Sequence, residues 1–258
     1  MHSLEVRTKA IAMVRRGARN VDAARAFGIP ARTVGVWLHR DRARRGELPE
    51  RSAPECPRCG GTKPPGAAYS YLLGLYLGDG CVSRLGRTFS LRIACADACP
   101  GLIEECARAV KTLRPGNRVQ RVQLAGHVSV GAYSNHWPCL FPQHGPGKKH
   151  DRHIALEAWQ EEIVDAHPWE LIRGLIHSDG CRITNWTTRM VAGKKKRFEY
   201  PRYFFTNKSD DIRGIFTDTL RRVGVEWTVL ARGHDPFNVS IARKASVALM
   251  EAHVGPKY

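Results

Sequence analysis

The chain has 258 residues and a formal net charge of +17, and its 30 arginines outnumber its 11 lysines. This length allows one large domain or two to three small ones. Arginine binds phosphate and guanine through its bidentate fork, so the composition indicates a polyanionic partner. No apolar run reaches the roughly 18 residues of a transmembrane helix, and the N-terminus lacks a signal-peptide core. We therefore expect no membrane partner and a cytoplasmic location.

Residues 1–48 are predicted to hold three short helices, with a turn at Gly28-Ile29-Pro30 before the third. In the third helix Val34, Trp37 and Leu38 recur at helical spacing and should face a core. The outward side is basic, as in a recognition helix that enters a major groove. The segment resembles homeodomain-like helix-turn-helix domains, and the alternative is a protein-binding unit. The predicted DNA contacts are Arg32, Thr33, Arg40 and Arg44.

Residues 49–66 are rich in Gly, Pro and charge and are predicted to be a linker. The linker contains Cys56-Pro-Arg-Cys59-Gly-Gly, which is half of a zinc knuckle, because tetrahedral Zn²⁺ needs four ligands. The alternative is a reduced cysteine pair in a loop, since all eight cysteines are expected to be reduced. Candidates for the missing ligands are Cys95 with Cys99, or a pool of Cys139, His144, His150 and His153.

Two stretches 100 positions apart, 72–80 and 172–180, repeat one pattern. They agree at Gly74/Gly174, Leu75/Leu175, Asp79/Asp179 and Gly80/Gly180. Each is predicted to be a helix, ended by a left-handed glycine at position 80 or 180. Small residues four apart on one face would let the two helices pack closely about a pseudo-two-fold axis.

The repeated aspartates would then meet at one end of the helix pair. A carboxylate in the last helical turn faces the negative end of the helix dipole, which is unfavourable unless a cation compensates. Carboxylates are ligands for such a cation, so Asp79 and Asp179 form a candidate two-carboxylate metal site.

The residues after each Asp-Gly pair predict the same order of elements in both halves. In residues 67–150 we expect strands at 81–84, 88–95, 118–124 and 127–133 and a helix at 100–113. In residues 151–258 we expect strands at 181–190, 197–206, 227–231 and 237–241 and helices at 210–223 and 245–253. The predicted class is α+β, with a three-helix domain followed by two pseudo-symmetric αββαββα repeats.

The two motifs resemble the signature of LAGLIDADG homing endonucleases of the single-chain type, over residues 67–258. The resemblance implies a monomer that acts as a pseudo-dimer on double-stranded DNA, with its strands forming a saddle in the major groove. It also implies a Mg²⁺-dependent endonuclease with Asp79 and Asp179 as catalytic residues. The basic residues expected to contact DNA are Arg84, Arg87, Arg92, Arg118, Arg121, Arg182, Arg189, Arg202 and Arg232 on or near the strands and Lys194, Lys195 and Lys196 at a hairpin tip.

Members of that family add polar and basic residues around each scissile phosphate. In the second half Asn207, Lys208, Arg243 and Lys244 look like these accessory catalytic residues. Alignment of the repeats gives Ala94, Cys95, Ala132 and Tyr133 in the first half, which lacks the basic residues. Three outcomes fit: cleavage helped by Lys148 or Lys149, nicking of one strand, or binding without cleavage.

Two other functions remain open at this point. A non-cleaving transcription regulator could use the saddle as a DNA clamp and the helix-turn-helix as its reader. An RNA-binding maturase is also compatible with the fold, although the sequence displays no aromatic stacking platform.

Overall fold

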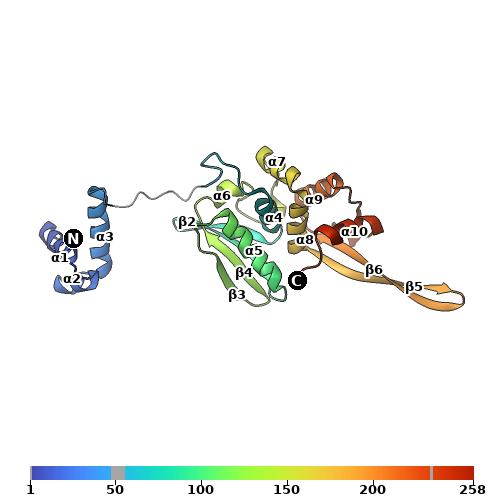
Figure 1. The fold of residues 1–258 in the computed structure, drawn as a ribbon, viewed down its shortest axis with the longest axis horizontal. Helices are drawn as coiled ribbons and strands as arrows, with labels where there is room; N and C mark the ends of the chain where they lie inside the picture. Colours follow the sequence, from blue (N-terminus) through green and yellow to red (C-terminus); the bar gives the residue numbers. More distant parts are fainter. Residues whose placement is uncertain (1, 48–55, 233–234) are drawn as a thin grey trace. The chain divides into compact units, whose positions relative to one another are not determined.

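The computed structural model describes residues 2–47, 56–232 and 235–258 (Figure 1). The chain forms two compact units, Met1–Pro54 and Glu55–Tyr258. Residues 49–55 of the predicted linker lie outside the described residues.

The first unit contains the three predicted helices, α1 (Leu4–Arg15), α2 (Asn20–Ala26) and α3 (Ala31–Arg44). Ala10, Ala23 and Val34, one from each helix, are completely buried and meet in a small core. Gly28 has φ +61° in the turn before α3, a backbone conformation that glycine adopts without strain.

The second unit holds two copies of one arrangement. The first copy is α4 (Gly66–Leu77), β1 (Gly80–Leu85), β2 (Thr88–Ala96), α5 (Pro100–Leu113), β3 (Gln120–Leu124), β4 (His127–Tyr133) and α6 (Trp137–Leu140). The second copy is α8 (Pro168–Asp179), β5 (Gly180–Val191), β6 (Lys194–Thr206), α9 (Asp210–Arg222), β7 (Thr228–Arg232), β8 (Asp235–Ile241) and α10 (Lys244–His253). A 3₁₀ turn (Lys149–Asp151) and α7 (Ala158–Ala166) connect them.

Each copy builds a four-stranded antiparallel sheet, in the orders β1-β2-β4-β3 and β5-β6-β8-β7. The two orders are the same, because β1 to β4 of the first repeat correspond to β5 to β8 of the second. The predicted α+β class with two αββαββα repeats is therefore confirmed. The β5–β6 hairpin is longer than its β1–β2 counterpart and extends beyond the helices of its own unit (Figure 1).

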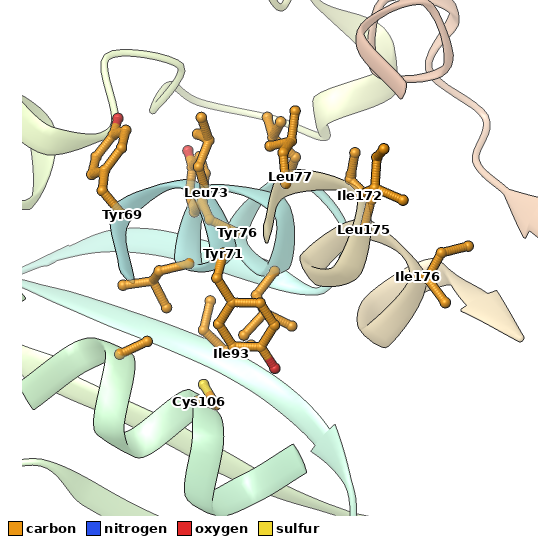
Figure 2. Close-up of a cluster of buried hydrophobic side chains, with 14 of the residues drawn as sticks. Tyr69, Tyr71, Leu73, Tyr76, Leu77, Ile93, Cys106, Ile172, Leu175 and Ile176 are labelled. Carbon is orange, nitrogen blue, oxygen red and sulfur yellow. The ribbon is translucent and has the colours of Figure 1, made fainter. Parts of the chain in front are cut away.

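Helices α4 and α8 pack side by side in the core of this unit (Figure 2). Tyr71 points from α4 toward Cys106 on α5, and Leu175 of α8 is buried beside α4. A methyl group on Gly74 would lie 2.6 Å from the carbonyl oxygen of Leu171, and one on Gly174 would lie 3.0 Å from the α-carbon of Gly74. The small residues therefore allow contact between the two backbones. Among the described residues, no helix is both long and apolar enough to span a membrane.

The predicted left-handed glycines at the helix ends are wrong. Gly180 has an extended backbone, with φ −103° and ψ 171°, and Gly80 begins strand β1. Both positions need glycine for another reason. A Cβ on Gly80 would lie 2.5 Å from the α-carbon of Tyr76, and one on Gly180 would lie 2.6 Å from the α-carbon of Ile176. Each chain turns back against its own helix too closely for a side chain.

Candidate active site

Asp79 and Asp179 lie at the carboxyl ends of α4 and α8, where the two helices are in contact. Asp179 is half-buried and Asp79 is exposed. A Cβ on Gly78 would lie 3.2 Å from Cγ of Asp179, so this carboxylate packs against the end of the neighbouring helix. The close helix packing thus brings both carboxylates to one place.

The environment of both carboxylates disfavours their charge. Removal of water by the surrounding protein raises the pKa of Asp79, against the attraction of nearby lysines. Burial and then repulsion from Asp79 raise the pKa of Asp179 to about 6. Such a pair gains stability from a cation placed between its members.

Two lysines approach this pair, one from the end of each repeat. Lys149 Nζ donates hydrogen bonds to the carbonyl oxygens of Tyr76, Gly78 and Gly80 at 2.5, 2.5 and 2.9 Å. Lys257 Nζ donates to the carbonyl oxygen of Ser178 at 2.8 Å. Each lysine therefore caps the carboxyl end of the motif helix of its own repeat, where the helix dipole is negative.

Both lysines attract the two aspartates, but this attraction does not offset the effect of burial on the pKa of either carboxylate. Burial lowers the pKa of Lys149 to about 8, although Asp179 and Asp79 oppose that shift. In the sequence, Lys148 and Lys149 lie between the two repeats, and one or the other was named as a possible aid to cleavage. Lys257 was missed, although both repeats end in a Gly- and Pro-containing segment followed by lysine, at 145–149 and 255–257, and this repetition is the signal that could have found it.

Asn207 lies beside the second aspartate. Its Nδ2 donates a 2.5 Å hydrogen bond to Oδ2 of Asp179, and its own side-chain oxygen accepts from the backbone N–H of Ser209 at 2.8 Å. A cleft of about 510 Å³ opens here, lined by Lys149, Asp179, Asn207 and Lys208 among others. Asn207 is therefore held from both sides and orients one carboxylate oxygen.

The first repeat differs at the corresponding position. Gly80 pairs with Ile93 across β1 and β2, and Gly180 pairs with Phe205 across β5 and β6. Two residues beyond each partner stand Cys95 and Asn207, so the strand register matches Asn207 with Cys95, one position beyond the Ala94 that alignment of the repeats gave. Cys95 is completely buried, and its thiol occupies the position that the Asn207 amide holds in the second repeat.

The other two predicted accessory residues lie elsewhere on the second repeat. Arg243 precedes α10 and forms an ion pair with Glu226, and Lys244 is exposed at the first position of that helix. Within the described part of the chain, neither of them lines the cleft beside Asp179.

The predicted DNA-contacting residues of the strands divide between two faces of the sheets. Alternate residues of a strand point to opposite faces, and one face of each sheet is covered by helices. The residues on the other, open face are Arg92, Arg189, Lys194, Lys196 and Arg202, as given by the strand register and the burial of their neighbours.

Arg121 and Arg182 lie on the helix-covered face instead. Arg121 is paired in register with the buried Val130 and forms a 2.8 Å ion pair with Glu104 of α5. Arg182 is paired in register with the buried Tyr203 and forms a 2.6 Å ion pair with Glu251 of α10. Strand alternation therefore turns these two arginines toward the helices, and they do not share the open face with the other strand residues.

The remaining basic positions lie at the edges of the repeats or in the first unit. Arg84 and Arg87 are exposed around the β1–β2 turn, Arg118 precedes β3, and Lys195 is exposed at the β5–β6 tip. Arg232 ends β7, and its side chain lies outside the described part. In α3, Arg32, Arg40 and Arg44 are exposed and Thr33 is half-buried.

The predicted zinc half-site gains two partners from the first repeat. Cys56 and Cys59 lie with His136 and Cys139, and the four potential ligand atoms are all within 4.8 Å of one another. Cys139 belonged to the predicted pool of missing ligands, whereas His136 did not. Cys95 lies near Asp79 instead.

No family model and no curated protein matches the chain. Among solved structures, mesophilic variants of the homing endonuclease I-DmoI are similar over 73% of this chain and 96% of theirs, at 16% identity and a TM-score of 0.48. The homing endonuclease I-WcaI bound to its DNA recognition sequence is similar over 80% of this chain and 89% of its own, at 12% identity and a TM-score of 0.46. Full-length DUF199/WhiA from Thermatoga maritima is similar over 74% of this chain and 56% of its own, at 9% identity and a TM-score of 0.45.

Proposed function

We propose that the chain is a sequence-specific DNA-binding protein of the LAGLIDADG type that hydrolyses phosphodiester bonds in double-stranded DNA with Mg²⁺. The observation that carries this proposal is the pair Asp79 and Asp179, brought together by helix packing, with raised pKa values and a lysine beside each helix end. Two carboxylates that can hold a cation, together with two nearby lysines, suit a negatively charged phosphate substrate.

The donor set fits Mg²⁺. Carboxylate oxygens are the ligands that this ion takes from proteins, and two of them leave most of its coordination shell for water and phosphate. Burial raises the pKa of both aspartates, and repulsion from Asp79 adds to the shift of Asp179, so a cation bound between them would stabilise both carboxylates. When bound, Mg²⁺ would activate a water and neutralise charge on the phosphate.

The chain's own residues would orient and balance this chemistry. Asn207 fixes the orientation of Asp179. Lys149 gives hydrogen bonds to three carbonyl groups, so its role is to position the end of α4. Lys257 donates to the carbonyl oxygen of Ser178 and is the better placed lysine to meet a phosphate. In the reaction, the water oxygen bonds to phosphorus and releases one proton to solvent, the bond from phosphorus to the leaving oxygen breaks, and the leaving oxygen takes up one proton from solvent.

DNA binding would use the open faces of both sheets. The residues available there are Arg92, Arg189, Lys194, Lys196 and Arg202, and two-stranded ribbons fit a major groove. The longer β5–β6 hairpin would reach further along the duplex than its counterpart. The three-helix unit would add a second contact as a helix-turn-helix, with α3 as its recognition helix. In this account one chain acts as a monomer, and its two repeats take the place of two subunits.

A second candidate is a DNA-binding regulator that does not cleave. Cys95 favours it, because the first repeat lacks at this position the amide that orients Asp179 in the second. Both candidates require DNA binding, and they differ only in hydrolysis.

A cleavage assay separates the two candidates. Purified protein would be incubated with supercoiled plasmid that carries the DNA flanking its own gene. Mg²⁺-dependent nicking or linearisation supports the nuclease. A footprint on that DNA without cleavage at any Mg²⁺ or Mn²⁺ concentration supports the regulator and overturns the nuclease.

A further inference from the structure

We propose that Cys56, Cys59, His136 and Cys139 bind one structural Zn²⁺ ion that fastens residues 56–62 to the first repeat. The four side chains come from two places in the sequence, 80 residues apart, and converge with their ligand atoms within 4.8 Å of one another. This proposal is independent of the nuclease proposal and concerns a different part of the unit.

The distances between the ligand atoms suit a tetrahedral ion. Bonds of about 2.3 Å to sulfur and about 2.0 Å to nitrogen place two sulfurs about 3.8 Å apart and a sulfur and a nitrogen about 3.6 Å apart. Cys59 Sγ lies 3.6 Å from Cys139 Sγ and 3.5 Å from His136 Nδ1, and Cys139 Sγ lies 4.0 Å from the same nitrogen. The side chains are thus already arranged around a common point.

The chemistry of the donors selects zinc over the ion proposed for the aspartates. Three thiolates and one imidazole are soft to intermediate ligands, whereas Mg²⁺ takes oxygen. Four protein ligands also fill a tetrahedral shell and leave no open position for water or substrate, which is the pattern of a structural site. Zinc here would stabilise the fold and take no direct part in hydrolysis.

The backbone prepares both halves of this site. Around the first pair, the N–H of Gly60 donates to the carbonyl of Cys56 at 2.7 Å and the N–H of Thr62 donates to that of Pro57 at 2.7 Å. These bonds form the tight turn that brings two thiols of a C-x₂-C pair together. His136 directly precedes α6 and Cys139 lies within it, and the N–H of Cys139 donates to the carbonyl of His136 at 3.1 Å.

Zinc would be the strongest attachment of this segment to the rest of the unit. Other contacts here include a cation–π contact of Arg58 with Trp159 at 4.4 Å and, one residue beyond the segment, an ion pair of Lys63 with Glu162 at 3.1 Å. Both charged groups of that ion pair are well exposed, and exposed pairs contribute little stability. The metal would therefore fix the point at which the chain enters the second unit.

The test measures metal content and coordination in the full-length protein. We expect one zinc per chain by elemental analysis after purification without added metal. Replacement by Co²⁺ should give the intense visible bands of tetrahedral thiolate coordination. An absence of zinc, an octahedral Co²⁺ spectrum, or a Cys59–Cys139 disulfide in freshly purified protein would overturn the proposal.

Single substitutions assign the ligands. Loss of a residue that only orients a zinc ligand costs about 10–100-fold in affinity, so Cys59→Ser, His136→Ala and Cys139→Ser should each weaken zinc binding by more than about 100-fold. The matched control is Cys99→Ser, because Cys99 is half-buried in the same repeat and lies outside the group. Equal zinc content in the control and the three variants would contradict the assignment.

A thermal measurement covers the case in which a variant folds poorly. Chelator should lower the Tm of the unsubstituted protein and of Cys99→Ser, and excess Zn²⁺ should restore it while excess Mg²⁺ should not. A Tm that does not respond to chelator in zinc-loaded protein would contradict a structural role.

Discussion

Asn207 donates a 2.5 Å hydrogen bond to the carboxylate of Asp179. The equivalent position in the first repeat carries the buried thiol of Cys95, so the two aspartates of the pair are held differently. A pseudo-symmetric backbone thus supports an asymmetric site. The expected difference in cleavage rate can be measured on each DNA strand separately.

The first prediction concerns the order in which the two DNA strands are cut. Asn207 orients Asp179, so one strand should be hydrolysed faster than the other and a nicked intermediate should accumulate. Asn207→Ala should slow the faster strand by about 10–100-fold, the usual cost of losing a residue that orients a metal ligand. A duplex labelled separately on each strand gives both rates. Equal slowing of the two strands would show that Asn207 does not act through one aspartate.

The second prediction is a bell-shaped pH profile. The pKa of Asp179 is raised to about 6, so its carboxylate gains protons, and activity falls, as the pH decreases through that value. The pKa of Lys149 is lowered to about 8, so the charge at the end of α4 is lost as the pH rises above it. Activity should be highest between these values, and bound Mg²⁺ should move the acidic limb to lower pH. Lys149→Gln keeps hydrogen-bond donors without the titrating charge and should remove the alkaline limb; an unchanged alkaline limb would contradict this assignment.

The third prediction concerns the helix contact. Gly74→Ala should destabilise the second unit by about 1–3 kcal/mol or more, because the added methyl meets the backbone of α8 and cannot be accommodated by a side-chain rotation. Gly214→Ala is the matched control, since Gly214 also lies in a helix and an added Cβ there meets nothing within 4 Å. The control should be stabilised by roughly 0.5–1 kcal/mol. Denaturant unfolding measures both, and equal stability of the two variants would exclude close backbone packing.

The fourth prediction separates the two faces of the sheets. Each phosphate contact contributes about −0.9 to the slope of log K against log salt concentration. Arg189 and Lys196 face each other across β5 and β6 on the open face. Arg189→Gln and Lys196→Gln each remove one positive charge there, and each should reduce the magnitude of the slope by roughly this amount. Arg121→Gln should leave it unchanged, because Arg121 is turned toward Glu104. A loss of slope in Arg121→Gln equal to that in Arg189→Gln would contradict the division of faces.

Much of this fold could be predicted from local sequence signals. The helix at 100–113 and the strand at 127–133 have the predicted bounds, because each carries a regular apolar period and ends at a turn. The repeated Gly74 and Gly174 predicted the helix contact, since only small residues allow backbones to meet. The bounds of α6, the last helix of the first repeat, were not predicted, because four residues are too few to display a helical period.

The remaining features depend on contacts between distant parts of the chain. Alternation along β3 does not reveal that Arg121 lies on the same face as Val130, because that requires the strand register. Nothing local to His136 joins it to Cys56, 80 positions earlier. Lys257 acts on the carbonyl of Ser178, and that pairing follows only from the folded repeat.

In the proposed function, Asp79 and Asp179 together form one hydrolytic site. The most direct measurement compares Asp79→Asn, Asp179→Asn and the unsubstituted protein for Mg²⁺-dependent cleavage and for binding of the same duplex. We expect each substitution to reduce cleavage of at least one strand by more than about 1,000-fold while binding stays within a few-fold, since the amide keeps the shape but loses the charge that holds the cation. Cleavage of both strands at the unsubstituted rate in either variant would contradict the account.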